Sequence, residues 1–366
     1  MSDIRGVDVG TMNLVCCKQV SETQVEIKNM RNMFLDINPS MLATTEIANT
    51  QLDYAVSKDD NGEADKIYIL GEDAYKFGNI FGQEVKRPMS KGVISSKEFD
   101  AIEVLTFMME KLIGRTTDGK LIYSIPAQAI DIDTPSILYH EKIFGRIFQT
   151  LGYESKPLNE AMGIIFSECS KTNFTGIAIS FGAGMTNVAC AYKGTPTLTF
   201  SVARGGDWLD NEVSASLGTI STRVTSIKEK ELNLANPNIG KKKEKVVREA
   251  LCFYYRNLIE YVLKHIVAKF EENSDGLQID EEIPIVVSGG TSLANGFVDA
   301  FKEVFAKFKD FPYEISEIRS AVDPLSAVAQ GNLIYALWQY KEKAKEQVKE
   351  VPKEEEKKEE TKGEEI

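Results

Sequence analysis

The sequence predicts an α/β fold built from two related halves. Near the N-terminus, "RGVDVGTMNLVCCKQ" alternates apolar residues on both sides of a glycine turn, which is typical of a β-hairpin. About half a chain later, "AISFGAGMTNVACAY" repeats this order, again with Met and Asn at the turn and a cysteine in the second strand. Buried apolar strands that alternate with helices follow each hairpin, as a largely parallel sheet requires. The repetition indicates a duplicated architecture.

In the first half, the hairpin is followed by a buried strand and a helix. "KLIYSIPAQAI" predicts the strand, which Pro126 closes. "DTPSILYHEKIFGRIFQTLGYES" predicts the helix, with Pro135 in its first turn and Gly152 near its end.

In the second half, glycine pairs twice join a strand to a helix. "TPTLTFSVA" predicts a strand, and Gly205-Gly206 then leads into a helix near Asp207. "EIPIVVSGGTSLANGFVDAFKEVF" repeats the pattern with Gly289-Gly290. Glycine lets a ligand approach the backbone, and a helix N-terminus attracts anions. Ordinary α/β packing would explain any one such unit, so the interpretation depends on their repetition.

Composition excludes several classes of protein. A length of 366 residues predicts two domains, and a net charge of −12 disfavours a broad nucleic-acid-binding face or attachment to anionic lipid. No apolar run is long enough to cross a bilayer, and "MSDIRG" enters a strand directly, without room for a signal peptide. The five cysteines form no CxxC pair, so we expect small core residues in a reducing cytoplasm. Cys16 and Cys17 should point to opposite faces of their strand.

Taken in order, these motifs resemble the actin superfamily, and they are most similar to bacterial actins of the MreB type. "GVDVGTMNLV" and "SFGAGMTNV" resemble its two phosphate motifs, and "GGDWLDNEV" resembles the glycine-aspartate turn of bacterial actins. "SIKEKE" resembles the nucleoside-contacting stretch, "VVSGGTSLANG" the adenosine motif and "DPLSAVAQGN" the final connecting helix. "KRPMSKGVI" resembles the Arg-Pro-x-x-x-Gly-Val-Ile segment of bacterial actins. The resemblance runs from Ile4 to about Tyr340.

The resemblance implies an actin-like α/β fold. Two ribonuclease-H-like halves, each with an inserted subdomain, would enclose ATP in the cleft between them. The implied division of the chain is 1–30, 87–150 and 319–345 for subdomain IA; 31–86 for IB; 151–192 and 249–318 for IIA; 193–248 for IIB; and 346–366 for a Lys/Glu-rich tail. The tail has too few apolar residues to fold and is predicted to be disordered.

The resemblance also implies a set of site residues. Asp8 would hold Mg²⁺ through water. Glu141 is the candidate for positioning the attacking water, with His140 as the runner-up; an exposed helix position is the alternative interpretation of both. The implied nucleotide-binding residues are Asp8, Gly10, Thr11, Met12, Asn13, Gly182, Ala183, Gly184, Met185, Gly206, Asp207, Lys228, Glu229, Gly289, Gly290 and Thr291.

One position departs from the family pattern. The second phosphate motif normally opens with an aspartate that helps to hold the waters of Mg²⁺, and this chain has Ser180 there. Ala183 also replaces the middle glycine of that motif. Backbone groups do most of the gripping, so nucleotide binding is still expected. With Asp8 as the remaining carboxylate, the sequence predicts slow ATP hydrolysis; the alternative is that another acidic residue, such as Glu141, compensates from the connecting helix.

Two functions fit the resemblance. The first is a cytoplasmic, cytoskeletal protein that binds ATP and Mg²⁺ and polymerises with itself as ATP turns over to ADP. The second is a non-polymerising, actin-like adaptor of a membrane or pilus machine. "RPMSKGVI" and the full motif spacing favour the first. The tail would be a solubilising segment or a docking site for a protein partner, and we expect no direct nucleic-acid partner and no transmembrane segment.

Overall fold

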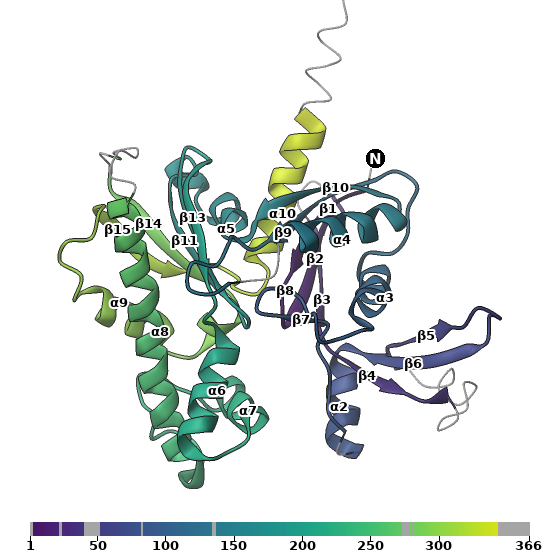
Figure 1. Cartoon of the computed structure of the whole chain (residues 1–366). Helices are drawn as coiled ribbons and strands as arrows, with labels where there is room; N and C mark the ends of the chain where they lie inside the picture. Colours follow the sequence, from purple (N-terminus) through teal and green to yellow (C-terminus); the bar gives the residue numbers. More distant parts are fainter. Residues whose placement is uncertain are drawn as a thin grey trace, which may run out of the picture.

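Each half of the molecule is built on one five-stranded sheet (Figure 1). The computed structural model describes residues 3–21, 24–39, 52–81, 83–133, 137–272, 279 and 281–342. The predicted helix start at 134–136 and the predicted tail, 346–366, lie outside these described residues.

The first sheet has the strand order β10-β9-β1-β2-β3. Its strands are β1 (Asp3–Val9), β2 (Asn13–Gln19), β3 (Val25–Arg31), β9 (Gly119–Ile125) and β10 (Tyr153–Asn159). β1 and β2 form the predicted antiparallel hairpin, whereas β1, β9 and β10 run parallel. Because side chains alternate along a strand, Cys16 packs under α3 (Ala101–Ile113) and α4 (Ile137–Thr150), and Cys17 packs under α10 (Ala327–Leu337). The opposite orientation of the two cysteines is confirmed.

The second sheet has the order β13-β12-β11-β14-β15 and repeats the hairpin and its parallel neighbour. Its strands are β11 (Gly176–Phe181), β12 (Thr186–Tyr192), β13 (Thr195–Val202), β14 (Ile283–Ser288) and β15 (Ile315–Ser320). α8 (Lys245–Glu272) and α9 (Phe297–Phe305) cover one face, and α5 (Glu160–Glu168) covers the other. The five described cysteines are all buried and reduced.

Each half carries an insertion on the same side of the molecule (Figure 1). The first consists of a three-stranded sheet, β4 (Phe34–Ile37), β5 (Tyr54–Lys58) and β6 (Ala64–Leu70), followed by α2 (Gly71–Phe81). The second contains α6 (Gly206–Leu217), α7 (Ser221–Lys230) and the short η3 (Lys242–Glu244). Three short elements lie elsewhere in the two halves: β7 (Met89–Ser90), β8 (Val93–Ile94) and η2 (Ser170–Thr172).

The strand pairing departs from the predicted division into subdomains at three edge strands. β10 follows residue 150, yet it hydrogen-bonds to β9 in the first sheet. β13 follows residue 193, yet it pairs with β12 in the second sheet, so the second insertion begins after Val202. β15 extends past residue 318 to Ser320 and pairs with β14. In each case the strand lies at the edge of its sheet, so the sequence does not show which side of the boundary it belongs to.

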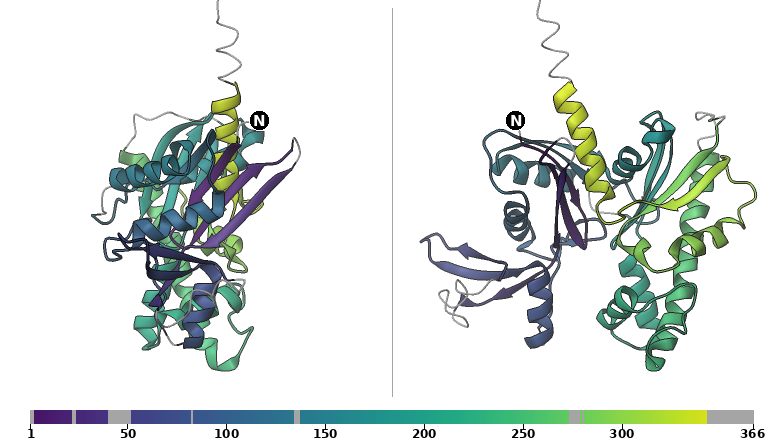
Figure 2. Two further views of the ribbon diagram at one scale, coloured as in Figure 1. Left: turned by 90° about the vertical axis from the view of Figure 1, so that its right-hand side faces the viewer. Right: turned by 180° about the vertical axis from the view of Figure 1, so that it is seen from behind.

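Two helices cross at backbone contact where the halves meet. A Cβ atom on Gly331 of α10 would lie 1.7 Å from the carbonyl oxygen of Gly163 on α5, so only glycine allows this approach. α10 also lies directly on β1, because a Cβ on Gly6 would be 2.1 Å from the Leu333 nitrogen. Asn332 Nδ2 donates to the Val7 carbonyl at 2.8 Å. Figure 2 (right view) shows this yellow helix between the halves. The crossing fixes the N-terminus of α5 beside the ends of β1 and β11.

Candidate nucleotide cleft

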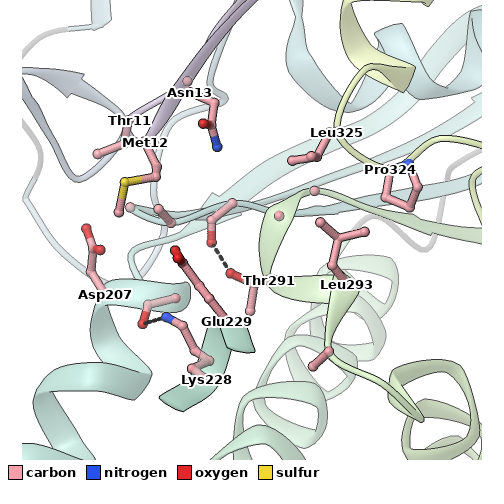
Figure 3. Close-up of a pocket in the computed structure, with 18 of the residues that line it drawn as sticks. Thr11, Met12, Asn13, Asp207, Lys228, Glu229, Thr291, Leu293, Pro324 and Leu325 are labelled. Atoms are coloured by element: carbon pink, nitrogen blue, oxygen red, sulfur yellow. Dashed lines mark hydrogen bonds between the residues drawn. The ribbon is translucent and has the colours of Figure 1, made fainter. Parts of the chain in front are cut away.

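A cavity of about 1030 Å³ lies between the two halves. This is at the upper end of the size range for small-molecule sites. Its wall contains every residue that the resemblance implied for nucleotide binding, from Asp8 to Thr291. Figure 3 shows Thr11, Met12 and Asn13 of the first half facing Asp207, Lys228, Glu229 and Thr291 of the second. The structure thus brings together segments that are far apart in the sequence.

The tips of the two hairpins have the same hydrogen bond. Gly10 N–H donates to the Asn13 carbonyl at 3.1 Å, and Gly182 N–H donates to the Met185 carbonyl at 3.0 Å. In each turn a Cβ on the glycine would come within 3 Å of the accepting oxygen, which accounts for glycine at both positions. The two tips therefore present their backbones to the cavity in the same way.

The tips also touch each other through the β7–β8 turn. Gly92 N–H donates to Thr11 Oγ1 at 3.1 Å. A Cβ on Gly184 would lie 2.6 Å from the same Thr11 oxygen, and a Cβ on Gly92 would lie 2.2 Å from Met185 Sδ. The segment that resembles the bacterial-actin Arg-Pro motif thus packs between the hairpins.

The end of the cleft beside α6 is tied to the second tip. Gly206 N–H donates to the Gly182 carbonyl at 3.0 Å, and Asp207 N–H donates to the Ala183 carbonyl at 2.9 Å. Thr291 Oγ1, at the start of η4 (Gly290–Leu293), also donates to the Gly182 carbonyl at 2.8 Å. The first N–H groups of α6 are therefore used within the protein, so α6 holds the second tip in place.

Two carboxylates reach the cavity beside these tips. Asp8, near the end of β1, accepts a hydrogen bond of 2.7 Å from Ser124 Oγ. Glu160, the first residue of α5, accepts from Ser180 Oγ at 2.7 Å and from Asn187 Nδ2 at 2.9 Å. Burial raises the pKa of Asp8. Burial first, and then the charge of Asp8, raises the pKa of Glu160. Ionisation of each buried carboxylate therefore costs free energy, and a nearby cation would offset that cost.

Glu160 was missed in the sequence. Ser180 stands where the family pattern has an aspartate, but its hydroxyl binds Glu160, so a carboxylate from α5 occupies this corner. The expectation that Asp8 is the single remaining carboxylate is therefore wrong. A local signal was available: Asn159 caps α5 by accepting from Ala161 N–H and Met162 N–H, and an acid that follows an N-cap lies at the helix start.

Comparison with known proteins identifies the chain. Residues 4–336 match the sequence model of the family described as Volactin. The chain belongs to the Volactin family. No curated protein sequence matches it.

Solved structures show that this Volactin chain has an actin-like fold. It superposes on "MamK double helical filament" with a TM-score of 0.65 at 15% identity, covering 92% of this chain and 99% of that chain. It superposes on MreB5 of Spiroplasma citri bound to ADP with a TM-score of 0.62 at 15% identity, covering 96% and 99%. For the ethanolamine utilization protein EutJ from Carboxydothermus hydrogenoformans, the TM-score is 0.51 at 15% identity, covering 90% and 89%. The predicted fold class and the resemblance to MreB-type bacterial actins are confirmed.

The two predicted catalytic residues lie away from the cleft of this Volactin chain. His140 on α4 is completely buried, and its ring packs 4.8 Å from that of Phe144. Burial lowers its pKa to about 4, and no described residue hydrogen-bonds to either ring nitrogen. The Glu141 carboxylate lies 4.0 Å from Lys142 Nζ. Neither residue lines the cavity, so the structure does not bring His140 or Glu141 to the candidate site.

The predicted nucleoside contacts have partners inside the protein. Lys228 Nζ donates to Asp210 Oδ2 at 2.7 Å and to the Gly206 carbonyl at 2.8 Å. Glu229 pairs across the cleft with Arg31 at 3.0 Å. Asp207 pairs with Arg87 at 2.9 Å, also across the cleft. These two partly exposed ion pairs join the first half to the second beside the cavity.

Proposed function

We propose that this chain binds ATP with Mg²⁺ in the cleft and polymerises into cytoplasmic filaments in a nucleotide-dependent way. The observation that carries the proposal is the pair of matching hairpin tips that face one cavity, with two carboxylates beside them. Backbone N–H groups grip phosphates, and carboxylates hold the cation that neutralises them.

The phosphate groups would bind to backbone N–H groups of both tips. Among the described residues, no hydrogen bond occupies the N–H of Thr11 or Met12 in the first tip, or of Ala183 or Gly184 in the second. These donors come from opposite halves of the molecule. A bound triphosphate would therefore hold the two halves together.

Asp8 and Glu160 fit a magnesium ion held mainly through water. Both offer carboxylate oxygen, which Mg²⁺ prefers, and Mg²⁺ usually keeps several waters and takes few protein ligands. Among the described residues, no group of three or more acidic, histidine or cysteine side chains is placed to hold a metal ion directly. When bound, Mg²⁺ would neutralise phosphate charge.

We assign the positioning of the attacking water to Glu160. Ser180 and Asn187 both donate to its carboxylate and so fix its orientation. A carboxylate held in this way can accept a hydrogen bond from water and direct the water at a phosphorus atom. With Glu160 in place, Ser180 is no longer a reason to expect slow hydrolysis.

The proposal of filaments is supported by the solved structures that share the fold. One is titled as a double helical filament, and the MreB5 structures are bound to ADP and AMPPNP. A head-to-tail contact that does not close on itself gives an open filament. No described helix is long and apolar enough to cross a membrane.

Nucleotide binding is tested by thermal shift with ATP and Mg²⁺. A hundredfold excess of ligand over Kd should add about 2.7 kcal/mol to the free energy of unfolding. Gly290 lines the cavity, and a Cβ there would meet only Leu325 Cδ2 at an ordinary 3.7 Å. Gly290→Ala should therefore fold and still bind, whereas Gly290→Phe should fold and lose the shift. A wild type that shows no shift with ATP, ADP or GTP would overturn the proposal.

Polymerisation is tested by pelleting and negative-stain microscopy with and without ATP. We expect a critical concentration and filaments that require nucleotide. A chain that binds ATP but stays monomeric at every concentration would instead be the non-polymerising adaptor. Truncation after Tyr340 should leave assembly intact, because the Lys/Glu-rich tail has too few apolar residues to build an interface.

A further inference from the structure

The outer strand of the first sheet is an open edge. β3 ends the strand order β10-β9-β1-β2-β3, and no described strand pairs with its outer side. Residues 25–29 are all exposed, including Val25 at 45% and Ile27 at 44%. In the left view of Figure 2, the purple strands of the N-terminal region reach the margin of the molecule. A long open edge with exposed apolar side chains is a template for pairing with another strand.

The backbone groups on this open side can be assigned from the hairpin. Successive residues of an antiparallel strand direct their N–H and C=O groups to alternate neighbours. Gly10 N–H bonds to the Asn13 carbonyl, so the backbone groups of Asn13 face β1. Every second residue of β2 after Asn13 therefore also directs its N–H and C=O groups toward β1. The intervening β2 residues therefore bond to β3, and their partners there include Glu26 and Lys28. The odd-numbered residues of β3, with Ile27 at the centre, direct their N–H and C=O groups outward.

The charges along this edge are self-complementary. If a second β3 strand pairs antiparallel with Ile27 opposite its own copy, Glu26 of each chain faces Lys28 of the other. Opposite charges directly across an antiparallel pair are favourable, and like charges are not. Within one chain the two charged groups are 3.7 Å apart and about half exposed, so this pair is weak and free to exchange partners.

We propose that β3 forms a two-fold contact between two copies of this chain, with antiparallel pairing centred on Ile27. Val25, Ile27 and Asn29 of each copy would exchange backbone hydrogen bonds across the contact, and the two first sheets would become continuous. The contact is isologous, so it closes a pair and does not extend a chain. It would join two filaments side by side, and contacts repeated along each filament would strengthen one another.

The register is tested by disulfide trapping. In a hydrogen-bonded antiparallel pair the two Cα atoms lie about 5.5 Å apart, within the range a disulfide spans. Ile27→Cys should therefore form a disulfide-linked dimer under mild oxidation. Val25→Cys is the matched control: the exposed fraction is the same, but its copy would lie roughly 14 Å away along the strand. The native cysteines are buried and should not interfere.

The charge pattern is tested in the Ile27→Cys background. Glu26→Lys places lysine opposite lysine twice and should reduce the dimer at least fivefold, and the double variant Glu26→Lys/Lys28→Glu should restore it. Each variant is tested with and without ATP and Mg²⁺, so the pairing is scored whether or not filaments form. Equal trapping of Ile27→Cys and Val25→Cys in both conditions, or no effect of Glu26→Lys, would overturn the proposal. Specific trapping without filaments would leave this contact standing and contradict the proposed polymerisation alone.

Discussion

The two halves build the same corner of the cleft with different residues. In the first half, Asp8 lies at the end of β1 and binds Ser124 of the parallel neighbour β9. In the second half, Ser180 lies at the matching point of β11 and is paired with Ser288 of the parallel neighbour β14. The scaffold is repeated, but the charge is not. The second carboxylate, Glu160, comes from a helix that the glycine crossing holds against the sheet.

In this chain the two halves thus place their carboxylates beside the cleft from different elements, a strand in the first half and a helix in the second. A cation between two hairpins needs carboxylates within reach, and the cleft does not distinguish a strand residue from a helix residue that arrives at the same point. Changing the helix carboxylate and changing the strand serine should therefore have unequal consequences.

Removal of the helix carboxylate should have the largest effect. Glu160→Gln keeps the side-chain size but replaces one accepting oxygen with an amide NH2 and removes the charge that accepts a proton from water, so we expect ATP turnover to fall roughly a thousandfold. ATP binding, measured by thermal shift, should remain. Glu141→Gln is the control from α4 and should turn over ATP at the wild-type rate. Equal losses of ATP turnover in both variants would contradict the assignment of the attacking water to Glu160 alone and would support a role for Glu141 of α4.

Ser180→Asp, which introduces the family's usual aspartate, should destabilise the second half of the molecule. Ser180 is 1% exposed and donates to Glu160, so Ser180→Asp places a second buried carboxylate against the first. The expected loss is about 4 kcal/mol in the free energy of unfolding, measured by urea titration. Ser180→Ala removes the donor without adding charge, so about 1 to 2 kcal/mol is expected for it. A Ser180→Asp protein that is as stable as wild type and hydrolyses ATP faster would contradict the claim that Glu160 already supplies the second carboxylate.

His140 should make stability depend on pH. Its pKa is lowered to about 4 by burial, so below its ordinary value of about 6.5 the unfolded chain binds a proton that the folded chain does not. The stability from this residue is present above about pH 6.5 and is lost as pH falls toward 4, by up to about 3 kcal/mol. Urea titrations at several pH values should show that the free energy of unfolding of His140→Leu falls less between pH 6.5 and pH 4 than that of wild type. The same dependence of stability on pH in wild type and His140→Leu would mean that the His140 ring is hydrated in the folded protein.

The ion pairs across the cleft should have the smallest effect. Arg31 and Arg87 each pair with a carboxylate of the other half, but both pairs are partly exposed, so each is worth at most about 1 kcal/mol. Because these pairs resist opening, Arg31→Ala and Arg87→Ala should release bound nucleotide up to about fivefold faster, measured with a fluorescent ATP analogue. Added salt should reduce the difference between wild type and variants. Release rates that match wild type at low salt would show that the pairs do not restrain the cleft.

The sequence predicts most of the cleft because its glycine turns leave a local signature. Gly10 and Gly182 are required by turns that any residue with a Cβ would obstruct, so they can be recognised one segment at a time. The local signal at Glu160, the Asn159 N-cap, places it at the start of a helix but not beside the cleft. Its position depends on the contact between Gly163 and Gly331, two residues far apart in the chain.

The placement of His140 and Glu141 away from the cavity has a related reason. The helix that reaches the cleft is the one that follows β10, and the sequence gives only a weak signal for that strand. β10 has a polar, largely exposed sequence, "YESKPLN", at the edge of its sheet. Once it is placed, the next helix is α5, and its first residue is Glu160.

A double-mutant cycle on Ser180 and Glu160 tests the central claim most directly. Urea titration should compare wild type, Ser180→Asp, Glu160→Gln and the double variant Ser180→Asp/Glu160→Gln, each with and without ATP and Mg²⁺. If the two side chains share one carboxylate position, Glu160→Gln removes the repulsion that Ser180→Asp creates. The double variant should then recover at least about 2 kcal/mol relative to the sum of the single changes, with the ATP-dependent stabilisation retained. Additive losses, with no coupling between the positions, would contradict the claim that the helix supplies the charge that the strand lacks.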